Sequence, residues 1–188
     1  MTAGTGVVVT AAGGSGAMTG FFDIKAALTG YDIGYIRFYP IVVDVTVTAI
    51  TFDDDGSIAN ISLSDSKTAW NDGDARGWEL YRASATDETR RVRGAGGTTV
   101  IGTQRTQVQQ RVISLVMVAG QIVTVADTTG STAPADPHTA SPLYVAGGDA
   151  IGRTGDPLYL ANLFLAVSAF GAASITVSKI VVRRQEAT

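Results

Sequence analysis

Two short acidic stretches hold the first candidates for chemistry, because Ca²⁺ takes about six to eight oxygen ligands from clustered carboxylates and carbonyls. The candidate ligands are Asp54, Asp55, Asp72 and Asp74. Neither stretch has the spacing of an EF-hand loop, and consecutive aspartates in an extended chain point in alternate directions. We therefore expect two solvated turns, with a Ca²⁺ ion between them only if the two loops meet.

The candidate catalytic residues lack the other residues that their reactions need. His138 is the single histidine and lies in a Pro-rich stretch, without a G-x-S-x-G element to accompany it. Ser64 and Lys67 match the S-x-x-K pattern, but they follow a strand pattern instead of opening a helix. Cysteine is absent, which removes thiol nucleophiles and thiolate metal sites. We expect a protein that is not an enzyme and that carries no cofactor apart from the Ca²⁺ ion considered above.

Charge is divided unevenly along the chain. The net charge is −3, yet residues 1–75 hold an excess of acids and residues 76–188 an excess of bases, with arginine far more frequent than lysine. Arg90, Arg91 and Arg93 form the densest basic stretch. Asp87 and Glu88 lie beside it and the sequence pI is about 5.0, so a protein interface is favoured over a nucleic-acid surface.

Period-two alternation of apolar residues dominates from residue 41 onward and predicts strands. Residues 41–52 and 58–63 are expected to form a hairpin, with a bulge near Ala49 and Ile50 where the apolar phase changes. Residues 112–118 and 121–126 predict a second hairpin. Further strands are expected at residues 78–83, 98–110, 158–170 and 174–182.

The strand spacing predicts an all-β fold, an antiparallel β-sandwich or jelly-roll, because no helices of crossover length separate the strands. Residues 21–188 are expected to form this domain. Residues 1–20 are expected to form a flexible, extended N-terminal arm, in which Val7, Val8 and Val9 are the one apolar cluster. The most apolar stretch, residues 158–170, is too short to cross a membrane.

The Ala-, Gly-, Thr- and Val-rich β sequence, the Gly-rich arm and the absence of cysteine and of catalytic motifs resemble small structural proteins of tailed-bacteriophage virions. Capsid decoration, cement and head-fibre proteins are the nearest kinds. The resemblance implies a virion subunit that binds its own copies and the major capsid protein. In this hypothesis the arm adds Val7, Val8 and Val9 to a neighbouring subunit, and Arg90, Arg91 and Arg93 contribute to the interface.

Two alternatives stay open. The first is a carbohydrate-binding β-sandwich, on a phage fibre or a secreted enzyme, that uses aromatic side chains as a sugar-stacking platform and Ca²⁺ as an aid. The aromatic candidates are Tyr31, Tyr35, Phe38, Tyr39, Trp70 and Trp78, although a role in the core is favoured for them. The second is a small hydrolase, which would need at least two convergent acids.

Overall fold

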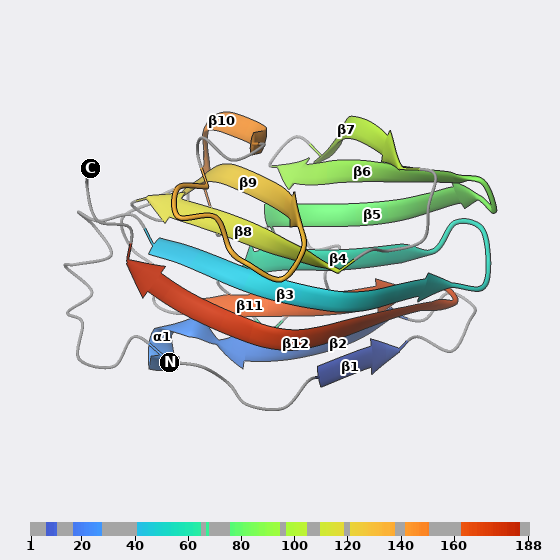
Figure 1. Ribbon diagram of the computed structural model, residues 1–188, viewed down its shortest axis with the longest axis horizontal. Helices are drawn as coiled ribbons and strands as arrows, with labels where there is room; N and C mark the ends of the chain where they lie inside the picture. The colour runs from blue at the N-terminus through green and yellow to red at the C-terminus, as the bar shows by residue number, and fades with distance from the viewer. Residues whose placement is uncertain are drawn as a thin grey trace.

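Two antiparallel sheets lie face to face in the computed structural model, which describes residues 7–10, 17–27, 41–64, 67, 76–94, 97–104, 110–118, 121–137, 142–150 and 163–184. Each sheet contains six strands within these residues, and one sheet lies behind the other in the view of Figure 1. The expected all-β sandwich is therefore confirmed. No helix in the described residues is long and apolar enough to span a membrane.

The first layer is called sheet A. Its strands, in spatial order, are β1 (Val7–Thr10), β12 (Ala173–Arg184), β3 (Ile41–Phe52), β8 (Arg111–Val118), β9 (Gln121–Thr129) and β10 (Pro142–Ala150). The expected hairpin near residue 120 is confirmed as β8 and β9, which pair directly from Val118 and Gln121 onward.

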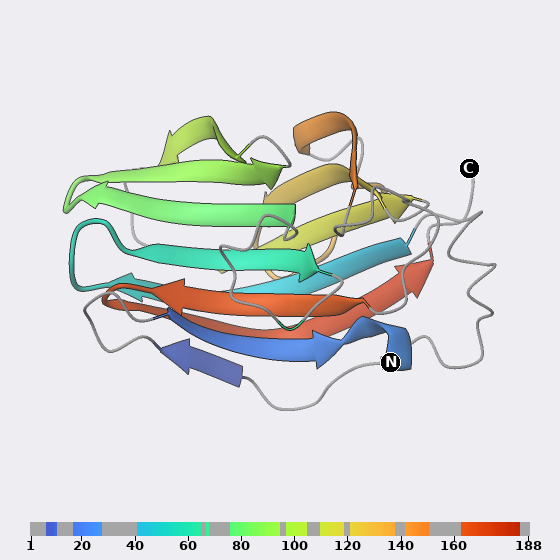
Figure 2. The ribbon, with the colours of Figure 1, turned by 180° about the vertical axis from the view of Figure 1, so that it is seen from behind.

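The second layer is called sheet B and faces the viewer in Figure 2. Its strands, in spatial order, are β2 (Ala17–Asp23), β11 (Phe164–Phe170), β4 (Ile58–Ser64), β5 (Arg76–Ser84), β6 (Asp87–Gly94) and β7 (Gly97–Gln104). A single helical turn, α1 (Ile24–Ala27), follows β2, and the Asp23 carboxylate accepts a hydrogen bond from the backbone N–H of Ala26.

Alternating side chains of both sheets fill the space between the layers. The buried apolar residues of sheet A include Val43, Val45, Val47, Ile113, Leu115 and Ile175, and those of sheet B include Ile61, Leu63, Trp78, Leu80, Leu165 and Val167. Along each strand these residues occupy every second position, so the period-two pattern of the sequence identifies the face of the strand that points to the core.

The bulge expected near Ala49 is confirmed. Ala49 lies opposite Thr176 and Val47 lies opposite Val177, so Thr48 is an extra residue on β3. One extra residue exchanges the two faces of the strand beyond it, which is why Ile50 faces the core on the opposite parity to Val47.

The expected hairpin between residues 41–52 and 58–63 is wrong. Both strands exist, but β3 pairs with β12 and β8 in sheet A, whereas β4 pairs with β11 and β5 in sheet B. The connecting residues 53–57 cross from one layer to the other. Gly56 and Gly171 adopt positive φ angles at this crossing and at the one between β11 and β12, a conformation that glycine adopts without strain.

The two crossings are hydrogen-bonded to each other. The backbone N–H of Asp53 donates to the carbonyl oxygen of Ala172 at 2.8 Å, and the N–H of Ala172 donates to the Ser57 hydroxyl at 3.1 Å. Alternation identifies which face of a strand is buried, but it carries no information on which sheet the strand joins. The sequence pattern therefore could not distinguish a hairpin from a crossing.

The described parts of residues 1–20 lie within the sheets. Val7–Thr10 pairs with β12 of the same chain, and the expected boundary at residue 20 falls inside β2, which pairs with β11. The described part of the expected free arm is thus strand, because β12 and β11 each offer an unpaired edge to the N-terminal residues.

Candidate functional site

Strands β5 and β6, which are neighbours in sheet B, are rich in charged residues. Their register places Trp78 opposite Val92, Glu79 opposite Arg91, and Leu80 opposite Arg90. Since successive side chains alternate between the faces of a sheet, Trp78, Leu80 and Val92 point into the core, and Glu79 and Arg91 point to the outer face of sheet B. The expected basic stretch is therefore divided: Arg90 lies on the inner face, and Arg91 and Arg93 lie on the outer face.

A buried charge pair joins the two layers on the inner side. The Asp127 carboxylate of β9 accepts hydrogen bonds from Arg111 Nη1 at 2.8 Å and from Trp78 Nε1 at 3.2 Å, and Arg90 Nη1 lies 4.0 Å away. The Asp127 and Arg111 side chains are 4% and 5% exposed. The pair of Asp127 and Arg111 is closed to solvent and, with Trp78 and the 29% exposed Arg90, links β8 and β9 of sheet A to β5 and β6 of sheet B, so its role is structural.

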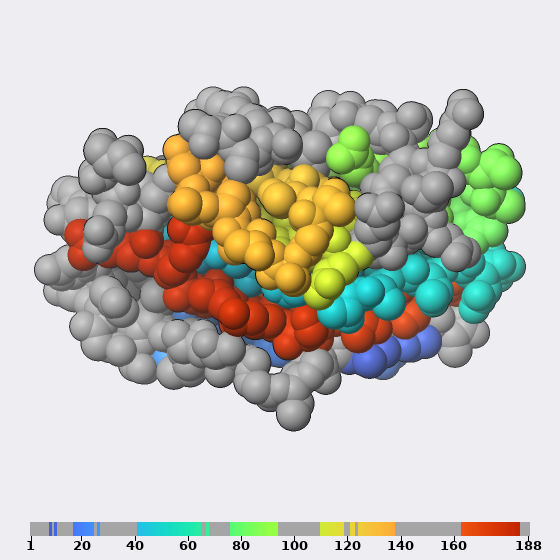
Figure 3. Space-filling view, viewed as in Figure 1, coloured from blue at the N-terminus to red at the C-terminus, as the bar shows by residue number. Residues whose placement is uncertain are grey.

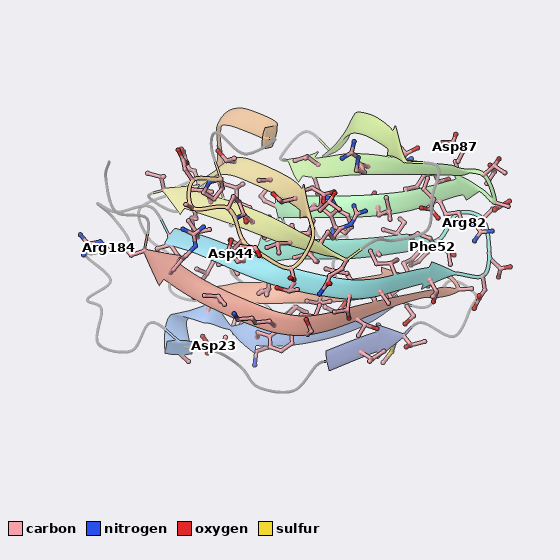
Figure 4. The ribbon with its side chains drawn as sticks, viewed as in Figure 1. Asp23, Asp44, Phe52, Arg82, Asp87 and Arg184 are labelled. Carbon is pink, nitrogen blue, oxygen red and sulfur yellow. The ribbon has the colours of Figure 1, made fainter. Side chains whose placement is uncertain are left out.

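Arg82 lies on the inner side of β5, near the end of the sandwich. Its guanidinium donates to the carbonyl oxygen of Phe52, beside which it lies in Figure 4, and pairs with Asp55 at 3.3 Å. Glu88 lies opposite Arg82 on β6 and is buried. Burial raises the pKa of Glu88 above its ordinary value of 4.5, while Arg82 and Arg111 act in the opposite direction.

The outer face of sheet B carries a second charged group. Arg91 Nη1 lies 3.5 Å from Glu79 Oε1, and the Arg91 guanidinium carbon lies 3.7 Å from the centroid of the Tyr81 ring. The Glu79 side chain is 1% exposed, whereas the Arg91 side chain is 23% exposed. Burial raises the pKa of Glu79 above 4.5, and Arg93 and Arg91 oppose this shift. Glu79 Oε2 has no hydrogen-bond partner.

Glu79 and Arg91 end a line of polar side chains that crosses five strands of sheet B. The members lie directly opposite one another in register, and we call them the polar row: Thr19 on β2, Ser168 on β11, Asn60 on β4, Glu79 on β5 and Arg91 on β6. With strands about 4.8 Å apart, the row is about 19 Å long.

Internal hydrogen bonds fix the middle of the polar row. The Thr19 and Ser168 hydroxyls are 3.0 Å apart, Asn60 Nδ2 donates to the carbonyl oxygen of Trp78 at 3.2 Å, and Ser62 Oγ donates to Asn60 Oδ1 at 2.9 Å. Ser168, Asn60 and Glu79 are buried. The row is therefore a set of pre-oriented polar groups, and Arg91 at its end is reachable from solvent.

The outer face of sheet A has its own polar group, at Asp44. This buried carboxylate accepts from Ser114 Oγ at 2.5 Å and from Arg183 Nε at 2.6 Å. The other Arg183 nitrogens donate to the carbonyl oxygens of Ala135 and Pro134 at 3.2 and 2.8 Å. Residues 130–137 (orange) lie over this face in Figure 3, so Arg183 and Asp44 anchor that loop to the sheet.

The remaining interface candidates lie on β1. Val7 and Val9 are opposite Val177 and Ile175 of the same chain, and the Val8 side chain is 60% exposed. The strand is thus already paired within the chain, while one of its apolar side chains remains available to a partner.

The metal candidates are only half described. Asp54 and Asp55 lie in the exposed turn between β3 and β4, where Asp55 pairs with Arg82. Asp72 and Asp74 lie outside the described residues, so a Ca²⁺ ion shared by the two loops stays a prediction. Within the residues that are described, no group of three or more histidine, cysteine, aspartate or glutamate side chains is placed to hold a metal ion.

The other sequence candidates have different outcomes. Trp78 is a fully buried core residue, as favoured above, and the other proposed stacking aromatics, like His138, lie outside the described residues. Ser64 ends strand β4 and Lys67 lies 5.1 Å above the Phe164 ring, so Ser64 does not open a helix. Sequence reasoning missed the buried acids Glu79 and Asp127; for Glu79 the available signal was its place between the core residues Trp78 and Leu80.

Comparisons with known proteins identify the fold and no family. No protein-family model and no curated protein matches the sequence. Among solved structures, an endo-acting O-glycanase of the human gut microbiota matches with a TM-score of 0.55 and 8% identity, over 95% of this chain and 79% of its own. The sialidase of Trypanosoma rangeli matches with a TM-score of 0.52 and 14% identity, over 94% of this chain and 25% of its own.

A PL7 alginate lyase from Zobellia galactanivorans matches at a TM-score of 0.48 and 9% identity, over 79% of this chain and 63% of its own. The chain therefore spans less than two thirds of this lyase and a quarter of the sialidase. At such identities the likeness shows the fold alone, an antiparallel β-sandwich of jelly-roll type.

Proposed function

We propose that this chain is a carbohydrate-binding β-sandwich module whose ligand surface is the outer face of sheet B. The observation that carries the proposal is the pair of Arg91 and Tyr81, which is partly exposed at the end of the polar row. Sugars present many hydroxyl groups, and a site that binds them needs donors and acceptors held in fixed directions beside an aromatic ring. Arg91 and Tyr81 supply a guanidinium group and a ring at the partly exposed end of the row, and the buried members Glu79 and Asn60 support them from below.

A further point supports a glycan ligand. The O-glycanase and the sialidase, whose names describe action on glycans, share the sandwich arrangement.

Binding is proposed instead of hydrolysis. Glycoside hydrolysis uses two carboxyl groups about 5 to 10 Å apart. Glu79 is the one carboxylate of the polar row, and an arginine pairs with it. The row therefore offers recognition groups without the second acid that the reaction needs.

The test is a glycan array probed with the purified chain, followed by titration calorimetry with any glycan that binds. We expect saturable binding that Tyr81→Ala weakens at least tenfold and that Lys179→Ala leaves unchanged, since Lys179 is exposed on sheet A. An array without any bound glycan, or equal loss of binding in both variants, would contradict the proposal.

A virion structural subunit remains the second candidate. Two large apolar side chains are exposed on neighbouring edge strands, Val8 on β1 at 60% and Met18 on β2 at 56%. Exposed apolar side chains on sheet edges favour contact with other copies or with the major capsid protein. Because β1 is paired with β12, assembly would use the outer side of β1 or an exchange of β1 between copies.

Light scattering coupled to size-exclusion chromatography tests this second candidate. An oligomer that Val8→Lys dissociates would support assembly through this edge, and a monomer at high concentration would count against it.

A further inference from the structure

The Arg91 guanidinium is held in place on two sides. The guanidinium carbon lies 3.7 Å from the centroid of the Tyr81 ring, and Glu79 pairs with Nη1 at 3.5 Å. The side chain keeps 23% of its surface exposed. A guanidinium fixed in this way loses little conformational entropy when it binds a ligand, because its orientation is set beforehand.

A single carboxyl group, that of Glu79, interacts with two arginines on this face, Arg91 and Arg93. A second cation lies on the same outer face, where the exposed Lys67 ammonium group is 5.1 Å above the Phe164 ring. Phe164 belongs to β11, so the two cations, each on an aromatic ring, lie over different strands of one face.

We propose, building on the carbohydrate-binding function above, that the ligand is an acidic glycan and that Arg91 binds its anionic group. A planar guanidinium matches the two oxygens of a carboxylate or sulfate with parallel N–H donors, and such charge-assisted bonds are roughly twice as strong as neutral ones. Tyr81 and Glu79 act as positioning residues that hold the guanidinium, and Lys67 adds attraction at a second point of the glycan.

The carboxylate and the sulfate share this chemistry, so the experiment separates them. The probes are polygalacturonate, which carries carboxylates, chondroitin sulfate, which carries both groups, and dextran, which is neutral. Binding is measured by affinity electrophoresis and calorimetry in about 0.15 M salt, where screening between exposed charges acts over about 8 Å. We expect binding to at least one acidic polysaccharide and none to dextran.

Variants then test Arg91 itself. Arg91→Gln is expected to weaken binding at least tenfold, whereas Lys179→Gln, which removes the same charge from exposed sheet A, leaves it unchanged. Arg91→Lys keeps the charge but lacks the planar guanidinium group. A loss of at least fivefold in the affinity of this variant would confirm that the guanidinium geometry matters. This variant also replaces Arg91→Gln as the test if Arg91→Gln fails to fold.

The outcomes separate the two proposals. Binding to a neutral glycan that Arg91→Gln leaves intact would overturn this inference and leave carbohydrate binding standing. No binding to any array glycan or polysaccharide would overturn both. Equal affinity for double-stranded DNA and for the acidic polysaccharide would show a general polyanion surface and would also overturn the inference.

Discussion

Replacing Asp127 by asparagine tests whether the buried cluster between the sheets holds the two layers together. Asparagine has nearly the same shape, so the change removes a charge with little change in packing. In the native protein the carboxylate accepts from Arg111 at 2.8 Å and from Trp78 at 3.2 Å. The variant removes the Asp127 carboxylate from the buried Arg111 guanidinium, and Arg90, at 4.0 Å, adds a second positive charge.

The structure sets the expected magnitude. Both side chains of the pair are at least 95% buried, and breaking a buried ion pair by removing one partner costs about 3 to 5 kcal/mol. For a domain of this size, 1 kcal/mol shifts Tm by about 2 to 4 °C. We therefore expect Asp127→Asn to lower the free energy of unfolding by about 3 to 5 kcal/mol and Tm by about 6 to 20 °C.

Urea unfolding followed by tryptophan fluorescence and by circular dichroism measures this loss. The double variant Asp127→Leu with Arg111→Met is the informative comparison, because apolar residues of similar volume often replace a buried ion pair at little cost. The double variant leaves the Trp78 N–H without the Asp127 acceptor, which lowers the free energy of unfolding by about 1 to 3 kcal/mol. A loss below about 1 kcal/mol in Asp127→Asn, or a double variant less stable than the single one, would refute the reasoning.

Two further predictions concern Glu79 and the loop on sheet A. Because burial raises the pKa of Glu79, the folded state binds its proton more tightly than the unfolded state, so stability falls as pH rises from about 4.5 through the raised pKa. Glu79→Gln should reduce this slope in urea midpoints measured across that range, and an unchanged slope would contradict the assignment. Asp44→Asn removes the charge that anchors Arg183, so residues 130–137 should be cleaved at least fivefold faster in limited proteolysis. Asp87→Asn, an exposed aspartate in β6, is the matched control, and equal cleavage in both variants would argue against the anchor.

Much of the fold was predictable from the sequence because burial in a sandwich follows a period of two. Val43, Val45 and Val47 predicted the inward face of β3, and the change of phase after them predicted the bulge at Thr48. The partner of β3 was not predictable in the same way. Its neighbour β12 lies more than 120 residues further along the chain, and the alternation within one strand does not indicate which other strand pairs with it.

The candidate site was predicted only in part. The basic stretch was evident from its charge, with Arg90, Arg91 and Arg93 close together in the sequence. Because adjacent residues of a strand face opposite sides of the sheet, closeness in the sequence did not place all three on one surface. Glu79 drew no attention, since a single acid inside a strand usually faces water. Its neighbours Asn60 and Arg91 come from two other strands, which the sequence alone does not bring together.

The pairing order has a consequence for synthesis on the ribosome. β12 lies between β1 and β3, and β11 lies between β2 and β4, so strands made after residue 163 occupy inner positions among strands made before residue 65. During synthesis the earlier strands therefore keep unpaired edges until residues 164–184 have left the exit tunnel. We expect a truncation that lacks these residues to aggregate, and we expect slow folding because these contacts are distant in sequence.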